Sequence, residues 1–162
     1  MLEQLKELLE MQRVLDEAIL KEHGNAYDEK IAEQMKIALF VELGELMNEL
    51  PKKFKHWKST AKDNREAALV EYVDALHFQL SLFNHFEVKV DEDFHDYNET
   101  REYYKWGTIN DCLIISTLYS DQKADLSGLF NLGNLLGFTW DEIYQAYKAK
   151  NEINYERLKN GY

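Results

Sequence analysis

Proline is nearly absent from this chain, and that scarcity limits the folds open to it more than any other feature. The residue occurs once, at Pro51, in 162 residues. Glycine is also sparse, with 7 residues, and helix formers such as Leu, Glu, Lys and Ala fill the intervals between these breakers. Because so few residues interrupt helices, we expect an all-α fold.

Helical periodicity and stop signals divide the chain into six expected helices. Apolar residues recur at helical spacing over 2–22, 28–50, 63–86, 103–119, 126–136 and 139–158. Gly24, Pro51 and Gly137 end three of these helices, and Thr139 with Glu142 forms a capping box that opens the last one. We therefore expect a single domain, 1–162, folded as a helical bundle with its active site between core helices. The charged, aromatic stretch 87–102 receives no role.

Charge and cysteine content narrow the partners and the compartment. The 19 basic and 30 acidic residues give a net charge of −11, which disfavours duplex nucleic acid because phosphate binding needs a basic face. The sequence has no amino-terminal leader and no apolar run near the roughly 20 residues that span a bilayer, so we expect a cytoplasmic protein with no membrane partner. The single cysteine, Cys112, lies in an apolar run and predicts a buried thiol in a reducing compartment.

Acidic residues interrupt the two most apolar of the expected helices. In the second helix, Glu42 and Glu45 are three residues apart and therefore lie on one face. In the third, Glu71, Asp74 and His77 are the only polar residues between positions 67 and 78. A helix as apolar as this one is expected to be buried, together with its acids.

Buried carboxylates need a partner, and these helices carry few basic residues. An unpaired buried carboxylate costs several kcal/mol or more, and converging carboxylates also repel one another. Hard divalent cations with oxygen ligands would neutralise them, so the pairs Glu42/Glu45 and Glu71/Asp74 predict a Mg²⁺ site for which Mn²⁺ is the expected substitute. The alternative is that each pair lies on a solvent-facing stripe, which is common for Glu at this spacing.

The metal motif carries a family resemblance. Glu42-x-x-Glu45, an interval of 25 residues and Glu71-x-x-Asp74 resemble the motif of the all-α NTP pyrophosphatases, which include dimeric dUTPases, MazG-like enzymes and dCTP pyrophosphatases. The dUTPase branch fits best. The resemblance implies a two-fold homodimer that converts dUTP to dUMP and pyrophosphate with two or more Mg²⁺ ions per site.

Further matches to the dUTPases concern the base. Gln12 and Asp16 in the first helix resemble the segment that helps to read uracil, although they could equally be surface polar residues. Trp57, followed by Lys58, is similar to a loop tryptophan that packs against the base. His77 falls where the family places a histidine on the base side, and its alternative is a satisfied core histidine.

The last helix resembles the family's phosphate and sugar motif. Lys150, Asn154 and Arg157 are spaced by four and three residues, so one helical face presents two cations and an amide. Such a face suits a triphosphate. The alternative is an ordinary solvated face.

The resemblance also implies roles in the reaction. We expect Glu42 and Glu45 to be the catalytic pair, with Glu42 as the general base that activates the water, and attack on the β-phosphorus that would admit dUDP as well. Competing functions remain open from the residues alone. These are the same reaction on dCTP or a non-standard NTP, a carboxylate-bridged di-iron bundle, which normally has Glu-x-x-His, and a non-catalytic helical adaptor.

Overall fold

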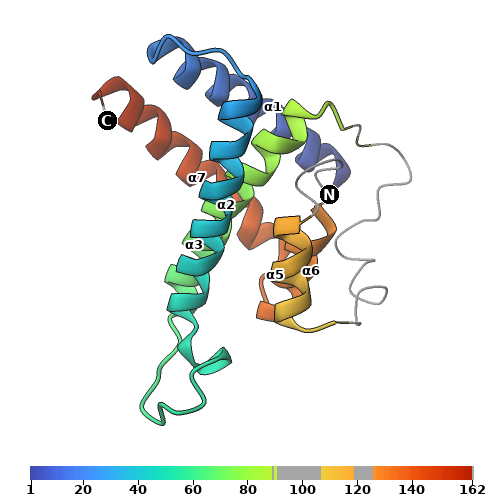
Figure 1. Cartoon of the computed structure of the whole chain (residues 1–162), viewed down its shortest axis with the longest axis vertical. Coiled ribbons are helices and arrows are strands. Elements are labelled where there is room, and N and C mark those ends of the chain that lie inside the picture. Colours follow the sequence, from blue (N-terminus) through green and yellow to red (C-terminus); the bar gives the residue numbers. More distant parts are fainter. Residues whose placement is uncertain (89, 91–106, 119–125, 162) are drawn as a thin grey trace.

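The computed structural model describes residues 1–88, 90, 107–118 and 126–161, and all secondary structure in them is helical. The helices are α1 (Leu2–Glu22), α2 (Glu29–Glu49), the short 3₁₀ helix η1 (Pro51–Lys53), α3 (Arg65–His85), α5 (Ile109–Leu118), α6 (Leu126–Leu136) and α7 (Trp140–Lys159) (Figure 1). The all-α prediction is confirmed. Across the described residues, no helix is both long and apolar enough to cross a membrane.

Local chemistry accounts for most helix ends. Asp28 caps α2 by accepting a hydrogen bond from the Ile31 amide, and Pro51 follows the end of that helix. Asn64 caps α3 in the same way. Because a side-chain oxygen at the N-cap satisfies an amide that has no partner within the helix, these residues place the helix starts.

One expected helix starts later than the sequence suggested. The prediction covered 103–119, whereas α5 begins at Ile109. Gly107 has a φ of 107°, outside the helical region, and the Asp111 carboxylate accepts hydrogen bonds from the amide and hydroxyl of Thr108. This turn sets the start of α5. Residues 103–106 and 119 of the prediction, and most of 87–102, lie outside the described residues.

Helix α3 is the central element of the bundle. It contacts α1, α2, α6 and α7, and α2 runs beside it as the other arm of a long hairpin (Figure 1). Tyr72 of α3 is fully buried and donates its hydroxyl hydrogen to the Leu129 carbonyl of α6. The central position of α3 places the side chains on its other faces against α1, α2 and α7.

The start of α7 is fixed against the start of α3. The predicted capping box is present, because Thr139 accepts from the Glu142 amide while the Glu142 carboxylate accepts from the Thr139 amide. Arg65 donates to both carboxylate oxygens of Glu142, at 2.8 and 3.0 Å, and to the Gly137 carbonyl. The first turn of α7 is thereby held, and the rest of the helix extends past α3 towards α1.

Candidate functional site

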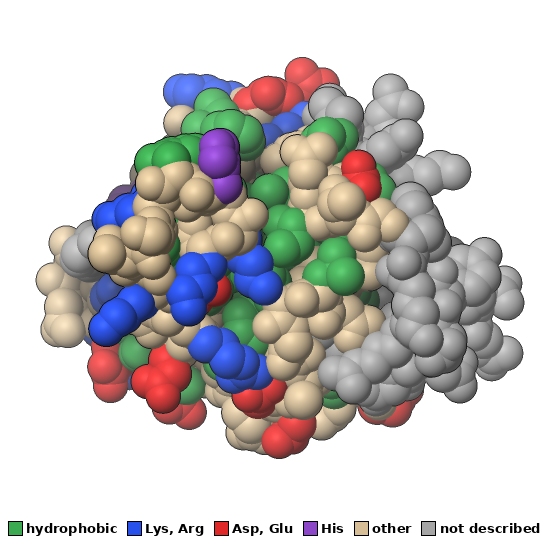
Figure 2. Space-filling model, turned by 90° about the horizontal axis from the view of Figure 1, so that it is seen from below, with side chains coloured by type: hydrophobic (Ala, Val, Ile, Leu, Met, Phe, Trp, Pro, Cys, Tyr) green, Lys and Arg blue, Asp and Glu red, His purple; other side chains and the backbone are tan. Residues whose placement is uncertain are grey.

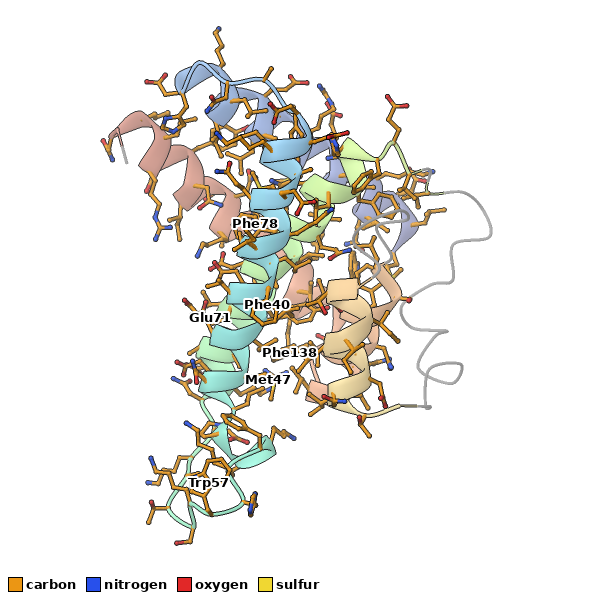
Figure 3. All side chains as sticks on the ribbon, viewed as in Figure 1. Phe40, Met47, Trp57, Glu71, Phe78 and Phe138 are labelled. Carbon is orange, nitrogen blue, oxygen red and sulfur yellow. The ribbon has the colours of Figure 1, made fainter. Side chains whose placement is uncertain are left out.

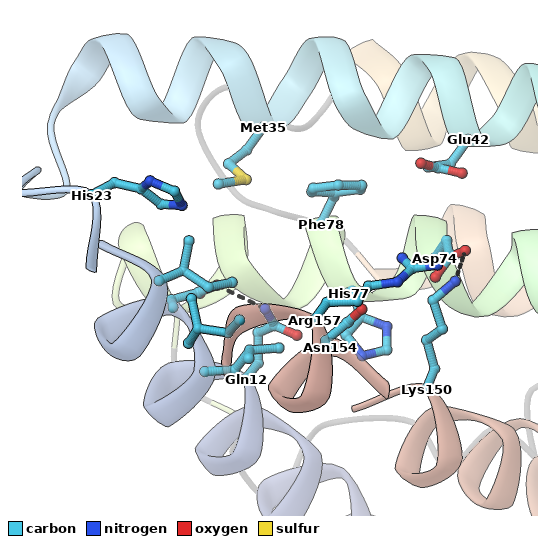
Figure 4. Close-up of a pocket in the computed structure, with 14 residues that line it drawn as sticks. Gln12, His23, Met35, Glu42, Asp74, His77, Phe78, Lys150, Asn154 and Arg157 are labelled. Atoms are coloured by element: carbon cyan, nitrogen blue, oxygen red, sulfur yellow. Dashed lines mark hydrogen bonds and ion pairs between the residues drawn. The ribbon is translucent and has the colours of Figure 1, made fainter. Parts of the chain in front are cut away.

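A cavity of about 270 Å³ opens where α1, α2, α3 and α7 meet (Figure 4). The residues that line it are Gln12, Leu15, Asp16, Ile19, His23, Met35, Glu42, Asp74, His77, Phe78, Lys150, Asn154, Arg157 and Leu158. The cavity combines an apolar wall with carboxylates near α2 and α3 and cations on α7. It therefore brings together residues that lie up to 146 positions apart in the chain, from Gln12 to Leu158.

Three of the four predicted metal-binding carboxylates converge. Glu42, Glu45 and Glu71 each offer an oxygen within 4.8 Å of the others. Burial raises the pKa of Glu42 to about 7, with further increases from the negative charges of Asp74, Glu45 and Glu71. Burial, followed by the charges of Asp74 and Glu45, also raises the pKa of Glu71. Such mutual repulsion is what a bound divalent cation would relieve.

The fourth carboxylate, Asp74, faces α7. Its Oδ2 atom accepts a hydrogen bond from Lys150 Nζ at 2.5 Å, and each side chain is only 16% exposed. Both residues line the cavity, as does Glu42 (Figure 4). Asp74 and Glu42 therefore connect the carboxylate cluster to the cavity, and Lys150 places a positive charge at that junction.

Polar side chains from α1 form the opposite part of the cavity. Gln12 donates from Nε2 to Asp16 Oδ1 at 2.7 Å, and its Oε1 accepts from the Tyr147 hydroxyl at 2.6 Å. Gln12 and Asp16 are both buried, and burial raises the pKa of Asp16 to about 6. The alternative of two surface polar residues is therefore wrong for this pair.

His77 is buried on α3 beside these groups. Its Nδ1 lies 2.8 Å from the Val73 carbonyl, and its ring stacks on Tyr147 with centroids 4.0 Å apart. Because a carbonyl only accepts, Nδ1 carries the ring hydrogen and Nε2 keeps its lone pair. Burial lowers the pKa of His77 to about 4. Nε2 is buried without a hydrogen-bond partner, so His77 is not a fully satisfied core histidine.

Trp57 and Lys58 do not line this cavity. They lie in the loop that closes the α2–α3 hairpin, well away from Phe78 along the hairpin (Figure 3). Trp57 is 68% exposed. Figure 2 looks onto this end of the molecule, where Lys and Arg side chains gather. The lysines of the loop are Lys52, Lys53, Lys55, Lys58 and Lys62.

The apolar part of the cavity was not predicted from the sequence. Met35 and Phe78 project into it from α2 and α3 (Figure 4). Met35 is seven residues, two helical turns, before Glu42, so it shares that helical face and could have been found by spacing. No signal distinguished Phe78 from the other apolar residues of α3.

The sequence matches the dUTPase family over residues 4–162. The chain belongs to this family. Its members are all-α enzymes, in agreement with the helices described above, and the activity is the pyrophosphohydrolysis of dUTP, a hydrolase reaction on an acid anhydride. No curated protein matches the chain. A dUTPase acts on a small nucleotide, which consists of phosphates, a sugar and a base. The cavity has carboxylates and cations in one part, and polar side chains beside an apolar wall in the other. This combination suits such a substrate.

Proposed function

We propose that Glu42, Glu45, Glu71 and Asp74 hold Mg²⁺, with two or more ions in the site and Mn²⁺ as a substitute. The support is the convergence of three carboxylates within 4.8 Å and the position of Asp74 beside them in the cavity. Hard oxygen ligands of this kind suit Mg²⁺. When bound, the ions would supply positive charge to the phosphates and polarise the phosphoryl oxygens.

In this proposal Glu42 takes the proton from the attacking water. Among the residues that the structure describes, it is the one that belongs both to the three-carboxylate cluster and to the cavity lining. A pKa near neutrality favours a general base, and burial with neighbouring acids raises that of Glu42 to about 7. Glu45, which is exposed, holds its place in the cluster from one turn further along α2.

Lys150, Asn154 and Arg157 bind the phosphates and sugar. All three line the cavity from one face of α7 (Figure 4). Lys150 would then share its charge between Asp74 and a phosphate oxygen, since its ammonium has three hydrogens to donate. This arrangement orients the triphosphate towards the carboxylates. Attack on the β-phosphorus is part of the proposal, and it makes dUDP a second substrate.

Gln12, Asp16 and His77 select uracil. Uracil carries an N–H between two carbonyls, whereas cytosine has a bare nitrogen there and an amine beside it. The lone pair on His77 Nε2 complements the uracil N–H, and the second hydrogen of Gln12 Nε2 complements a carbonyl. A site built on such bonds can reject the mismatched base by a factor on the order of 10⁴. For Trp57 to cover the base and Lys58 to contact the nucleotide, their loop must move or reach the cavity of a second copy.

We also propose one domain and a homodimer. The family match over residues 4–162 supports the single domain. The dimer rests on an apolar groove between α2 and α5, lined by Phe40, Leu43, Gly44, Met47, Leu113, Ile114 and Thr117. The buried thiol of Cys112 supports the prediction of a reducing, cytoplasmic location.

Replacement of one carboxylate tests the metal site. We expect Glu45→Gln to abolish dUTP turnover in Mg²⁺ while unfolding free energy stays equal or rises in chelator, because one of several repelling charges is removed. Glu33→Gln, an exposed acid on the same helix, is the control and should keep full activity. Asp74→Asn should also be inactive, but it leaves Lys150 without its carboxylate and is the less clean variant.

The readout is release of pyrophosphate or phosphate from dUTP, dUDP, dCTP and dTTP, with Mg²⁺, with Mn²⁺ and with chelator. More than about a tenth of wild-type activity in Glu45→Gln would remove Glu45 from the metal site, since loss of a group that only orients a metal ligand already costs about 10- to 100-fold. A kcat/KM for dUTP less than about tenfold above that for dCTP would contradict the base-reading part, because hydrogen-bonded sites discriminate more strongly.

A further inference from the structure

Tyr147 contacts two of the three side chains proposed to select uracil, yet it does not line the cavity. It lies on α7, is fully buried, and reaches α1 and α3 from behind the cavity wall. Its hydroxyl donates to Gln12 Oε1 at 2.6 Å. Its ring lies parallel to the His77 imidazole, with an angle of 9° between the planes and 4.0 Å between centroids. One side chain therefore touches two residues that lie 65 positions apart, Gln12 and His77.

Asp16 and the Tyr147 hydroxyl together hold the Gln12 amide in one orientation. Asp16 as a carboxylate only accepts, so the amide nitrogen must face it, as the 2.7 Å bond shows. The amide oxygen then faces Tyr147, whose hydroxyl has a hydrogen to give. A rotated amide would set its oxygen against the Asp16 carboxylate, and the Tyr147 hydroxyl would then have to accept from the amide nitrogen instead of donating to the amide oxygen. Two bonds thus leave one N–H and one lone pair of Gln12 in a defined direction.

The ring of Tyr147 fixes the second group. His77 is anchored at Nδ1 by the hydrogen bond to the Val73 carbonyl. This bond alone leaves the tilt of the imidazole plane free. The parallel contact with Tyr147 holds the imidazole plane and hence the direction of the Nε2 lone pair. Nε2 itself is buried and has no hydrogen-bond partner. An acceptor held in this way is suited to one donor from a bound molecule.

We propose that Tyr147 is a positioning residue that sets base selectivity in this dUTPase without contact to the nucleotide. The proposal rests on the roles proposed above for Gln12 and His77. Tyr147 acts on the first through its hydroxyl and on the second through its ring. Removal of the hydroxyl alone separates the two effects, because phenylalanine keeps the ring, the volume and the stacking.

The matched pair Tyr147→Phe and Tyr144→Phe tests the proposal. Tyr144 is on the same helix and donates its hydroxyl hydrogen to Glu7 at 2.7 Å, but it does not line the cavity or contact Gln12. The quantity is the ratio of kcat/KM for dUTP to that for dCTP, with Mg²⁺. We expect Tyr147→Phe to lower this ratio about tenfold, the effect of one misdirected hydrogen bond, with little change in kcat for dUTP. Tyr144→Phe should leave the ratio unchanged.

Gln12→Ala separates failure of this proposal from failure of the proposed function. If Gln12→Ala lowers the ratio and Tyr147→Phe does not, the positioning role is wrong and the base-reading role of Gln12 stands. If Gln12→Ala leaves the ratio unchanged, both the base-reading role of Gln12 and the positioning role of Tyr147 are wrong. If both single variants lower it, the double variant should be no less selective than Gln12→Ala, because the hydroxyl acts only through Gln12. If the losses of selectivity in the two single variants add in the double variant, the Tyr147 hydroxyl does not act through Gln12.

A measurement on the wild-type chain covers the case in which Tyr147→Phe does not fold. A buried, bonded Tyr147 hydroxyl exchanges slowly with water and should give its own proton resonance, assigned by its contact to the Gln12 amide. We expect dUMP to shift this resonance more than dCMP does at equal saturation. A resonance that does not respond to dUMP would overturn the proposal.

Discussion

Two buried titratable side chains of the cavity respond to pH in opposite directions. Burial raises the pKa of Asp16 to about 6 and lowers that of His77 to about 4. Between those values Asp16 keeps its proton in the folded chain but loses it in the unfolded chain, so a rise in pH lowers the stability of the folded chain. The same rise deprotonates His77 in the unfolded chain, which removes a preference for the unfolded state. In the wild-type chain the two contributions offset each other.

Asp16→Asn should uncover the Asp16 contribution. The folded pKa lies about two units above the unfolded value, so the stabilisation is present below about pH 4 and is lost as pH rises through 6. Asparagine does not titrate and can still accept from Gln12. The unfolding free energy of the variant minus that of the wild type should therefore rise by up to about 3 kcal/mol between pH 4 and 7.

Urea unfolding of both proteins at several pH values measures this difference. All other titrating groups are common to the two proteins, so they cancel in the subtraction. A difference that stays flat with pH would show that Asp16 is ionised as easily in the folded chain as in the unfolded one.

At the scale of single elements, the sequence predicted the helices well because their ends depend on neighbouring residues. Pro51, Asp28 and the Thr139 capping box act within one turn, and α1, α2, α3, α6 and α7 begin and end within two residues of the predicted positions. The predicted start of α5 was wrong because the turn at Gly107 comes before the helix, which therefore begins only at Ile109. Its apolar residues alone did not reveal the turn.

How the helices pack against one another was harder to predict from the sequence. Spacing placed Glu42 with Glu45, and Lys150 with Asn154 and Arg157, each on one helical face, and the cavity contains most of them. Spacing could not pair Asp74 with Lys150, 76 residues apart, nor place Tyr147 behind Gln12. Those contacts depend on how α7 crosses α3 and α1. The position of Trp57 outside the cavity has the same origin, since a loop residue has no helical face.

Thr139→Ala tests whether α7 depends on its cap. The Thr139 hydroxyl accepts from the Glu142 amide, and loss of an N-cap acceptor costs about 1 kcal/mol. We expect urea unfolding to show that loss, with kcat/KM for dUTP unchanged, because the cap is at the other end of α7 from Asn154 and Arg157. The exposed Thr60→Ala is the control and should change stability by less than about 0.5 kcal/mol. A drop in activity without a drop in stability would contradict the expectation that the capped start of α7 contributes to stability and only its other end to activity.

At the scale of the whole molecule, one helical face of α2 is apolar and exposed within the described part of the chain. Ile37, Phe40 and Val41 are 63%, 68% and 46% exposed. Gly44, one turn after Phe40, has open space around the position of a Cβ, so another helix can approach closely there. Exposed apolar residues that gather in this way, unlike single scattered ones, mark a surface for association. An isologous dimer would bury each of these side chains twice.

Phe40→Lys should therefore weaken the proposed dimer. Full burial of a phenylalanine contributes about 1.5–3 kcal/mol, and two-fold symmetry doubles the loss, so the dimer Kd should rise by roughly 10² to 10⁴. Light scattering over a range of concentrations measures this, with 19.2 kDa as the mass of one chain. Leu135→Lys is the matched control, because Leu135 is 39% exposed on α6 and does not line the α2–α5 groove. A wild-type mass of one chain at micromolar concentration would refute the dimer. A dimer weakened equally by Leu135→Lys would show that the α2 face is not its specific interface.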